Sequence, residues 1–152
     1  MLLSLIYVSR SRLDLPAQAG EVDRIVTGST ERNAGLRVRG ALIFTERHFA
    51  QILEGPDAAI AALMESITRD WRHDRVTVIE KRPVDCYHFP DWSLAYWGNA
   101  SYMDGHISRI LDKSDALGRE LQTADLAALM QMLSRESRGR ERPLGRPSPG
   151  SC

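Results

Sequence analysis

Residues 38–56 read VRGALIFTERHFAQILEGP, and this stretch decides the fold that the sequence predicts. Two short apolar runs, 38–44 and 49–53, flank the polar segment Thr45–His48, whose length suits a hairpin connection. Successive side chains of a strand point to opposite faces, and both faces of the second run are largely apolar. A strand of this kind lies in the centre of a sheet, with other elements packed on either side.

Apolar residues recur at helical spacing on each side of this hairpin. Upstream, Pro16 can open a helix, and Gly35 suits the left-handed cap that ends it. Downstream, Asp57 can cap a second helix. The stripe of the first helix contains Val22, Ile25, Val26 and Ser29, and that of the second contains Ile60, Leu63, Met64, Ile67 and Trp71.

Strands at the two ends of this region complete the predicted sheet. Leu2–Val8 is a compact apolar run that forms a first strand. A fourth strand around Val76–Val78 ends at Pro83, and Trp92–Trp97 forms a fifth after a turn. The resulting order, β-α-β-β-α-β-β, predicts a ferredoxin-like α+β fold with two helices on one face of a mixed sheet.

The character of the chain changes after Gly98. Apolar spacing predicts two helices, one around Ile107–Leu111 and one that Thr123 can cap, and we expect both to cover the open face of the sheet. From Ser134 onward Arg, Gly, Pro and Ser dominate, which is typical of a disordered tail. We therefore divide the chain into a globular domain at 1–98, a C-terminal helical cap or output segment at 99–134 and a tail at 135–152.

The composition argues against several classes of partner. Lysine plus arginine and aspartate plus glutamate both number 20, so no net charge recruits nucleic acid or an anionic membrane. No apolar run approaches the roughly 20 residues of a membrane span, and the short apolar N-terminus lacks the basic segment and cleavage site of a signal peptide. Cys86 and Cys152 lie far apart and predict neither a disulfide framework nor a CxxC metal site, so a reducing cytoplasm fits best.

Motifs of nucleotide-dependent or hydrolytic enzymes are absent from the sequence. It has no GxxxxGKS/T loop, no GxGxxG turn and no HExxH helix. The 4 histidines are scattered over different predicted elements, and none has a partner at zinc-ligand spacing. We therefore expect no catalytic residue, no metal site and no enzymatic activity.

Polar side chains at positions that the pattern buries are the candidates for function. Gln51 lies on the central strand between apolar residues, and Tyr7 shares a face of the first strand with two leucines. A buried amide or hydroxyl without a partner costs about 1–3 kcal/mol, so each needs a hydrogen-bond partner. On the fifth strand, we expect one face to be shared by Trp92, Leu94 and Tyr96.

The two helices contribute further polar candidates. Ile25, Ser29 and Asn33 form one stripe of the first helix, and the second helix ends in Asp70-Trp-Arg-His73. Each residue alone also has a purely structural explanation. Asn33 can help to end a helix, and the acid and the arginine after the second helix can form an exposed ion pair worth about 0–1 kcal/mol. A strand tyrosine or tryptophan usually belongs to the core, and a strand glutamine is usually satisfied by solvent or by local groups.

Taken together, these positions resemble the BLUF family, the sensors of blue light using flavin. The similarity extends from about Leu3 to Trp97. The stretches that carry it are, in chain order, Tyr7-Val-Ser9, Arg32-Asn33, Gly40-Ala-Leu-Ile-Phe44, Phe49-Ala-Gln-Ile-Leu-Glu-Gly-Pro56, Asp70-Trp-Arg-His73 and His88-Phe-Pro-Asp-Trp-Ser93. Each stretch is weak alone, but their order and spacing are specific.

The resemblance implies a flavin that lies between the two helices and against the sheet. FAD is the family's usual cofactor, with FMN and riboflavin as alternatives. By resemblance, Asn33 hydrogen-bonds the polar edge of the ring system, and Gln51 lies between the Tyr7 hydroxyl and the ring. The other implied contacts are Ile25 and Ile67 on the ring faces, Ser29 and Arg32 beside them, and Asp70, Arg72 and His73 at the ribityl and phosphate end.

The resemblance also implies a photochemical path. Blue light makes the flavin an oxidant, Tyr7 gives up an electron and then a proton, and Gln51 is rearranged by rotation or tautomerisation. The flavin absorption then shifts slightly to the red, and the signal passes through Trp92 and the fifth strand to the C-terminal helices. Two positions depart from the family pattern. Leu94 replaces a common methionine and cannot accept a hydrogen bond, and Arg39 replaces a small hydroxyl residue.

We therefore expect residues 1–98 to be a photosensor domain that signals by changing shape rather than by catalysis. No enzyme domain follows it, so the expected output is contact with a separate effector protein, or self-association, through the helices after Gly98. Two alternatives stay open. One is a flavin-free ferredoxin-like binding or regulatory module, and the other is an acylphosphatase-like hydrolase with an anion loop at Arg37-Val-Arg-Gly40 beside Asn33.

Overall fold

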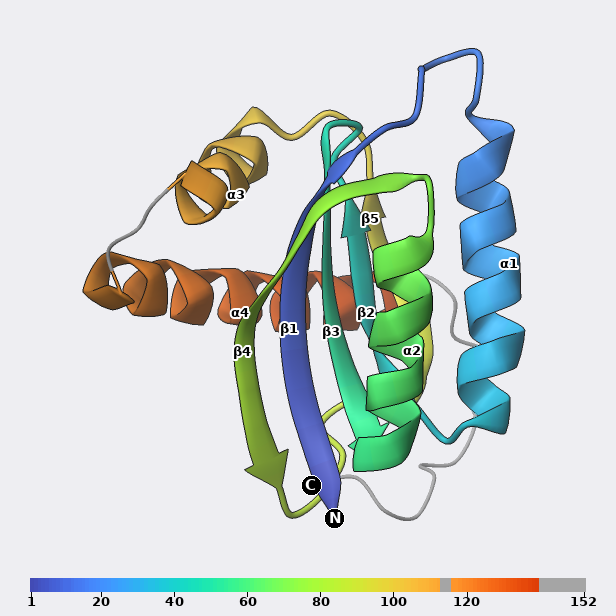
Figure 1. Cartoon of the computed structure of the whole chain (residues 1–152), viewed down its shortest axis with the longest axis vertical. Helices are drawn as coiled ribbons and strands as arrows, with labels where there is room; N and C mark the ends of the chain where they lie inside the picture. The colour runs from blue at the N-terminus through green and yellow to red at the C-terminus, as the bar shows by residue number, and fades with distance from the viewer. Residues whose placement is uncertain (113–115, 140–152) are drawn as a thin grey trace.

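The computed structural model describes residues 1–112 and 116–139. Its elements follow one another along the chain (Figure 1) as β1 (Leu2–Ser11), α1 (Gly20–Gly35), β2 (Arg39–Phe44), β3 (His48–Pro56), α2 (Asp57–Arg69), β4 (His73–Val84), β5 (Trp92–Trp97), α3 (Ser101–Asp112) and α4 (Ala116–Gly139). This order confirms the predicted β-α-β-β-α-β-β arrangement followed by two C-terminal helices.

β3 lies at the centre of a five-stranded sheet with the order β4-β1-β3-β2-β5. It pairs antiparallel with β1 and with β2, while β4 pairs antiparallel with β1 and β5 pairs parallel with β2. This is the predicted ferredoxin-like topology, extended by β5 into a mixed sheet. Because β3 is hydrogen-bonded along both edges, its side chains are held at fixed positions.

Each face of the sheet is covered by its own pair of helices (Figure 1). α1 and α2 pack on the face that carries Phe49 and Leu53 of β3, whereas α3 and α4 pack on the face that carries Ala50 and Ile52. β3 has apolar side chains for both of these cores, and it is buried along almost its whole length. The prediction that the C-terminal helices cover the second face is confirmed.

α1 begins later than predicted, and it ends at Gly35 as predicted, but without the left-handed cap at that residue. Pro16 lies in a separate turn, closed by a 2.7 Å hydrogen bond from the N–H of Gln18 to the carbonyl of Asp14, and the helix begins only at Gly20. At the other end Gly35 is still helical. The residue with left-handed backbone is Arg37, which has φ 55°.

Two strands run past their predicted ends. β3 continues through Gly55 to Pro56, because these residues pair with the first residues of β1. β4 contains Pro83, which an edge strand tolerates because its outer edge needs no ladder hydrogen bond.

Asp57 is the first residue of α2 and makes no capping side-chain hydrogen bond, so the predicted cap is wrong. A carboxylate in the first turn still interacts favourably with the helix dipole.

The side chains of β5 change faces partway along the strand. Leu42 of β2 pairs with Leu94, but the next β2 residue, Ile43, pairs with Tyr96, so one residue of β5 is extra. Trp92 and Leu94 therefore pack on the side of α1 and α2, whereas Tyr96 packs with α3 and α4. The prediction that the three share a face is wrong, because a strict period of two does not survive a bulge.

The helices after β3 show further differences. Trp71 lies beyond the end of α2 and is 52% exposed, so it is not part of the apolar stripe. Thr123 is buried within α4 and does not begin it. α4 continues to Gly139, so the predicted boundary of the tail at residue 135 is wrong, and residues 140–152 lie outside the described residues.

Two findings bear on the expectation about the cellular compartment. Cys86 is disulfide-bonded, so the expectation of reduced cysteines does not hold at this position. Of the helices that the structure describes, none combines the length and the apolar character that crossing a bilayer requires.

Candidate functional site

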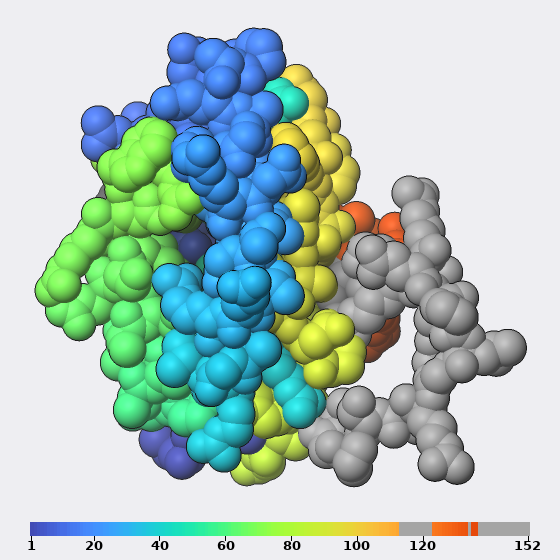
Figure 2. Space-filling model, turned by 90° about the vertical axis from the view of Figure 1, so that its right-hand side faces the viewer, coloured from blue at the N-terminus to red at the C-terminus, as the bar shows by residue number. Residues whose placement is uncertain are grey.

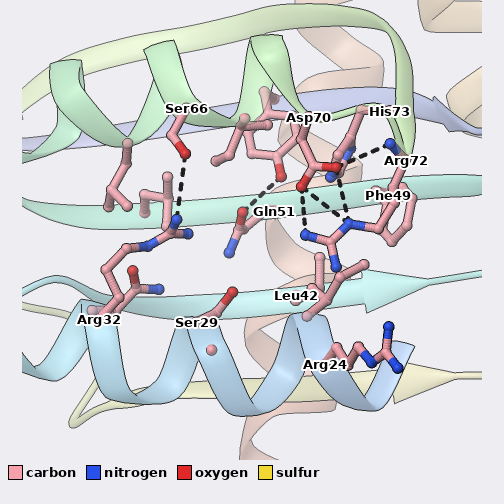
Figure 3. A pocket seen from close by; sticks show the side chains of 17 residues that line it. Arg24, Ser29, Arg32, Leu42, Phe49, Gln51, Ser66, Asp70, Arg72 and His73 are labelled. Atoms are coloured by element: carbon pink, nitrogen blue, oxygen red, sulfur yellow. Dashed lines mark hydrogen bonds and ion pairs between the residues drawn. The ribbon is translucent and has the colours of Figure 1, made fainter. Parts of the chain in front are cut away.

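A cavity of about 140 Å³ lies between α1 and α2, with the sheet as its floor. In the space-filling view (Figure 2), a hollow separates the two helices, and atoms of β1 are visible at its bottom. Tyr7 of β1 and Gln51 of β3 contribute to the floor, and the helices supply the walls. Figure 3 shows Gln51 between the two helices. The cavity therefore lies where the topology brings the central strand beneath both helices.

The residues predicted to contact a flavin all line this cavity. α1 contributes Ile25, Ser29, Arg32 and Asn33, α2 contributes Ile67, and the segment after α2 contributes Asp70, Arg72 and His73. By contrast, Trp92 and Leu94 do not line it and instead pack in the apolar core beside it.

Tyr7 and Gln51 form a buried hydrogen bond at the floor of the cavity. The Tyr7 hydroxyl donates to Oε1 of Gln51 at 2.7 Å, and the two residues are 1% and 5% exposed. Burial raises the pKa of Tyr7, and the negative charge of Asp70 raises it further, so the phenol keeps its proton. Among the described residues, the Nε2 group of Gln51 has no hydrogen-bond partner, so it is free to donate to a ligand.

Asn33 carries a buried acceptor without a partner. The residue is 1% exposed, and no described residue donates a hydrogen bond to its Oδ1. A buried acceptor that is left unpaired costs about 1–3 kcal/mol. A ligand that presents an N–H group to the α1 wall would satisfy it.

An ion-pair network forms the mouth of the cavity at the end of α2. Arg72 binds Asp70 in a bidentate manner, with Nε 2.9 Å from Oδ1 and Nη2 2.6 Å from Oδ2, and its Nη1 lies 3.6 Å from Glu21. Burial alone would raise the pKa of Asp70, but the hydrogen bonds from Arg72 outweigh burial and lower it below its ordinary value. The mouth therefore carries fixed charges.

Arg32 is a second cation on the wall, and no described carboxylate pairs with it. Its Nη1 donates to Oγ of Ser66 at 3.5 Å, so the contact reaches from α1 to α2 (Figure 3). A guanidinium with free donors recognises phosphate well.

His73 lies between the mouth and the floor. Its ring centroid is 4.3 Å from that of Phe49, and its Nδ1 is 2.8 Å from Oγ of Ser9. Burial lowers the pKa of His73 to about 4, because desolvation of the imidazolium outweighs the attraction of Asp70. The imidazole is therefore neutral near pH 7.

Several lining residues were not predicted from the sequence, namely Arg24, Gly28, Leu42, Phe49, Leu53 and Ser66, whereas Leu63 was expected in the apolar stripe of the second helix. Arg24 and Gly28 precede Arg32 at spacings of eight and four, and this helical stripe could have identified them. Leu42 lines the cavity because it pairs with Gln51 across β2 and β3. No pattern within β2 alone indicates this pairing.

The anion loop of the hydrolase alternative is not formed. Asn33 lines the cavity, but the guanidinium of Arg39 lies 4.1 Å from the ring centroid of Tyr87, at a different surface of the chain. The two groups therefore do not converge on one anion.

The polar groups of the cavity fit a flat ligand with an N–H donor at one end and a phosphate at the other. The cavity itself is smaller than the roughly 300–1,000 Å³ of typical small-molecule sites. Polar contacts between the two walls include the Arg32–Ser66 hydrogen bond from α1 to α2 and the ion pair of Glu21 on α1 with Arg72 after α2.

Comparisons with known proteins agree with this geometry. Residues 2–95 match the BLUF family, described as sensors of blue-light using FAD. The photoactivated adenylate cyclase subunit beta of Euglena longa is 35% identical over 99 residues, which are 61% of this chain and 11% of that protein. The blue light- and temperature-regulated antirepressor BluF of Escherichia coli is 37% identical over 73 residues, which are 48% of this chain and 18% of that protein. The chain thus spans only a small part of either relative.

Two solved structures of short proteins resemble most of this chain. The photo-activated state of BlsA has a TM-score of 0.67 and 20% identity, and the match covers 88% of this chain and 95% of BlsA. The dark-state structure of the BLUF protein BlrB has a TM-score of 0.57 and 30% identity, and the match covers 81% of this chain and 96% of BlrB.

Proposed function

The chain belongs to the BLUF family of blue-light sensors, and from this premise we propose that its Tyr7–Gln51 pair converts light absorption by a flavin between α1 and α2 into a change at α3 and α4. Family membership makes the chain a flavin-binding blue-light photoreceptor, and BLUF domains bind FAD or FMN. The observation that carries the proposal is the buried hydrogen bond from Tyr7 to Gln51 at the floor of the cavity.

The residues that line the cavity divide into three groups by what they offer a flavin. Asn33 accepts from the N–H of the ring through Oδ1, and Gln51 donates from Nε2. Ile25 and Ile67 provide apolar contact from opposite helices, with Ser29 beside them. The phosphate end meets Arg32, Arg72 and His73, while Asp70 holds the guanidinium of Arg72 in place.

Tyr7 and Gln51 carry the photochemical change. When bound, the flavin absorbs blue light and supplies a strongly oxidising excited state. Tyr7 is the phenol at the cavity floor, and its 2.7 Å hydrogen bond gives its proton a direct path to Gln51. Gln51 then rearranges, by rotation or tautomerisation, while Tyr7 takes back its electron and its proton, so that no net oxidation remains. The rearranged Gln51 offers the cavity a different hydrogen bond. A stronger hydrogen bond to the ring shifts the absorption to the red.

The signal leaves through α3 and α4 and ends in contact with a partner protein or a second copy of the chain. Ala50 and Ile52, the neighbours of Gln51 on β3, face the core under these helices, so a change at Gln51 reaches that core directly. Tyr102 and Met132 of the two helices are 74% and 50% exposed and can serve as contact residues.

Signalling through a partner, rather than catalysis by this chain, is supported by two of the relatives. The Escherichia coli relative is named an antirepressor. The match to the cyclase subunit covers 11% of that protein, so this comparison does not support cyclase activity in the chain.

The test of this function is the absorption spectrum of the purified, flavin-loaded chain before and after blue illumination. We expect a small red shift that reverses in the dark without net reduction of the flavin. A spectrum that blue light leaves unchanged, or that bleaches permanently, would contradict the proposal.

A further inference from the structure

A second buried polar group lies on β3, and the photochemistry proposed above makes no use of it. Glu54 is 1% exposed and does not line the cavity. Its Oε2 accepts hydrogen bonds from the backbone N–H groups of His88 and Phe89 at 2.7 and 3.4 Å. Its Oε1 lies 2.9 Å from Nδ1 of His88. The carboxylate thus ties the loop between β4 and β5 to the central strand.

A second set of contacts ties the same loop to β2. Arg39 donates from Nη1 to the carbonyl of Phe89 at 3.4 Å, and its guanidinium lies 4.1 Å from the ring centroid of Tyr87. The Tyr87 hydroxyl donates to the carbonyl of Arg37 at 2.7 Å. The loop is therefore held from β2 as well as from β3.

The anchored loop leads directly into Trp92. The N–H of Gly40 donates to the carbonyl of Asp91 at 2.9 Å, and Gly40 pairs with Trp92 across β2 and β5. A Cβ atom at Gly40 would lie 1.9 Å from the carbonyl oxygen of Ile52, so β2 and β3 meet there too closely for any side chain. The anchored loop is therefore hydrogen-bonded to β2 at Asp91, the residue before β5 begins.

The position of Trp92 depends on contacts other than a hydrogen bond from its own indole. The residue is 6% exposed, and its Nε1 is buried without a hydrogen-bond partner among the described residues. An unpartnered buried N–H favours any arrangement that returns it to water. Apolar packing and the position of the loop must therefore hold the indole in the core.

We propose that Glu54 is a positioning residue for Trp92: its carboxylate holds the loop at residues 85–91 against β3 and keeps the indole in the core on the side of α1 and α2. Gln51 and Glu54 lie on the same strand, so the contact also links a change at Gln51 to the start of β5. This second effect rests on the proposed function, whereas the position of Trp92 in the dark does not.

Two substitutions of Glu54 distinguish the effect of its hydrogen bonds from the effect of filling the buried space. Glu54→Leu removes every acceptor contact with His88 and Phe89 and puts an apolar side chain of similar size in place of the carboxylate. Glu54→Gln keeps a carbonyl oxygen for the backbone N–H groups, and its amide can donate to Nδ1 of neutral His88. Arg39→Ala removes the second anchor at a residue that is only partly buried.

The position of Trp92 is measured by acrylamide quenching of its fluorescence. The chain has 3 tryptophans, and the other two, Trp71 and Trp97, are 52% and 41% exposed. Replacing both with Phe leaves Trp92 as the sole reporter. In flavin-loaded protein kept in the dark, we expect the quenching constant to rise about fivefold in Glu54→Leu and about twofold in Arg39→Ala, and to stay unchanged in Glu54→Gln.

An unchanged quenching constant in Glu54→Leu overturns the proposal, as does an equal rise in Glu54→Leu and Glu54→Gln. If Glu54→Leu does not fold, the quenching constant of Arg39→Ala tests whether the anchored loop holds Trp92. The absence of a rise in that constant overturns the proposal. After illumination, Glu54→Leu should return to the dark spectrum about threefold more slowly, because the anchored loop favours the dark arrangement. If the unsubstituted chain gives no red shift, the proposed function fails, but the quenching test of Glu54 keeps its meaning.

Discussion

Tyr7 and Gln51 face one another directly across β1 and β3, and the Tyr7 hydroxyl donates a 2.7 Å hydrogen bond to Oε1 of Gln51. The ladder between the two strands sets both side chains opposite one another. The amide thus stands between a buried phenol and the cavity, with Nε2 available to a ligand. A small change in its orientation alters the hydrogen bonding of the cavity and acts on β3, the strand that carries it.

Tyr7→Phe should bind flavin but show no reversible red shift, because the ring no longer has a hydroxyl proton to give. We expect a loss of about 1 kcal/mol in the free energy of unfolding, the usual net value of one hydrogen bond. Tyr102→Phe is the matched control, since Tyr102 is 74% exposed, and it should keep the full shift. A reversible shift of normal size in Tyr7→Phe would show that this phenol is not the donor.

Asn33→Leu should affect the loaded and the flavin-free protein in opposite directions. Flavin titration should show affinity about tenfold weaker, because the acceptor for the ring N–H is gone. Urea unfolding of the flavin-free protein should show equal or slightly greater stability, because Oδ1 of Asn33 has no partner to lose among the described residues. The exposed Asn99→Ala should change neither quantity. Unaltered flavin affinity in Asn33→Leu would remove Asn33 from the binding site.

Arg32→Ala should discriminate between flavins by their phosphate. We expect affinity for FAD and FMN to fall about tenfold, and more at low ionic strength, while affinity for riboflavin stays the same. Ser66→Ala tests the contact across the two helices without removing the charge, and it should leave all three affinities nearly unchanged. An equal loss for riboflavin in Arg32→Ala would place Arg32 away from the phosphate.

The flavin-free protein should lose stability as the pH falls from about 6.5 to about 4. Burial lowers the pKa of His73 from 6.5 to about 4, so in this window the unfolded chain binds a proton that the native chain does not. The loss reaches at most about 3 kcal/mol. Asp70 has a lowered pKa, so its contribution is lost only as the pH falls below its ordinary value of 3.8.

Urea unfolding at pH 7 and at pH 4.5 measures this effect. The difference between the two stabilities should largely disappear in His73→Gln, which keeps a polar side chain near Oγ of Ser9 but does not titrate. If the substituted protein loses as much stability as the unsubstituted one, His73 is not the group responsible.

Much of the fold follows from local patterns in the chain. The central strand was predictable because Phe49, Ala50, Ile52 and Leu53 alternate between two apolar faces. The walls of the cavity were predictable because Ser29 and Asn33 continue the apolar stripe of a helix. In both cases the period of one element is sufficient, and no knowledge of its partners is needed.

The remaining features depend on pairing between distant segments. Tyr96 changed faces because the register of β5 against β2 slips by one residue, which the sequence of β5 does not encode. Glu54 reads as the end of a strand before Gly-Pro, but its partners lie 34 and 35 residues further along the chain. The contact between Arg32 and Ser66 joins α1 to α2, two helices that are far apart in the chain. Such contacts become visible only once the elements are assembled.

The most direct test of the account is the light-minus-dark absorption difference of flavin-loaded Gln51→Leu, compared with the unsubstituted chain. Leucine fills a similar volume but can neither accept from Tyr7 nor donate to the cavity. We expect a reversible red shift in the unsubstituted chain and none in Gln51→Leu, although flavin is still bound. A reversible red shift of the same size in Gln51→Leu would contradict it.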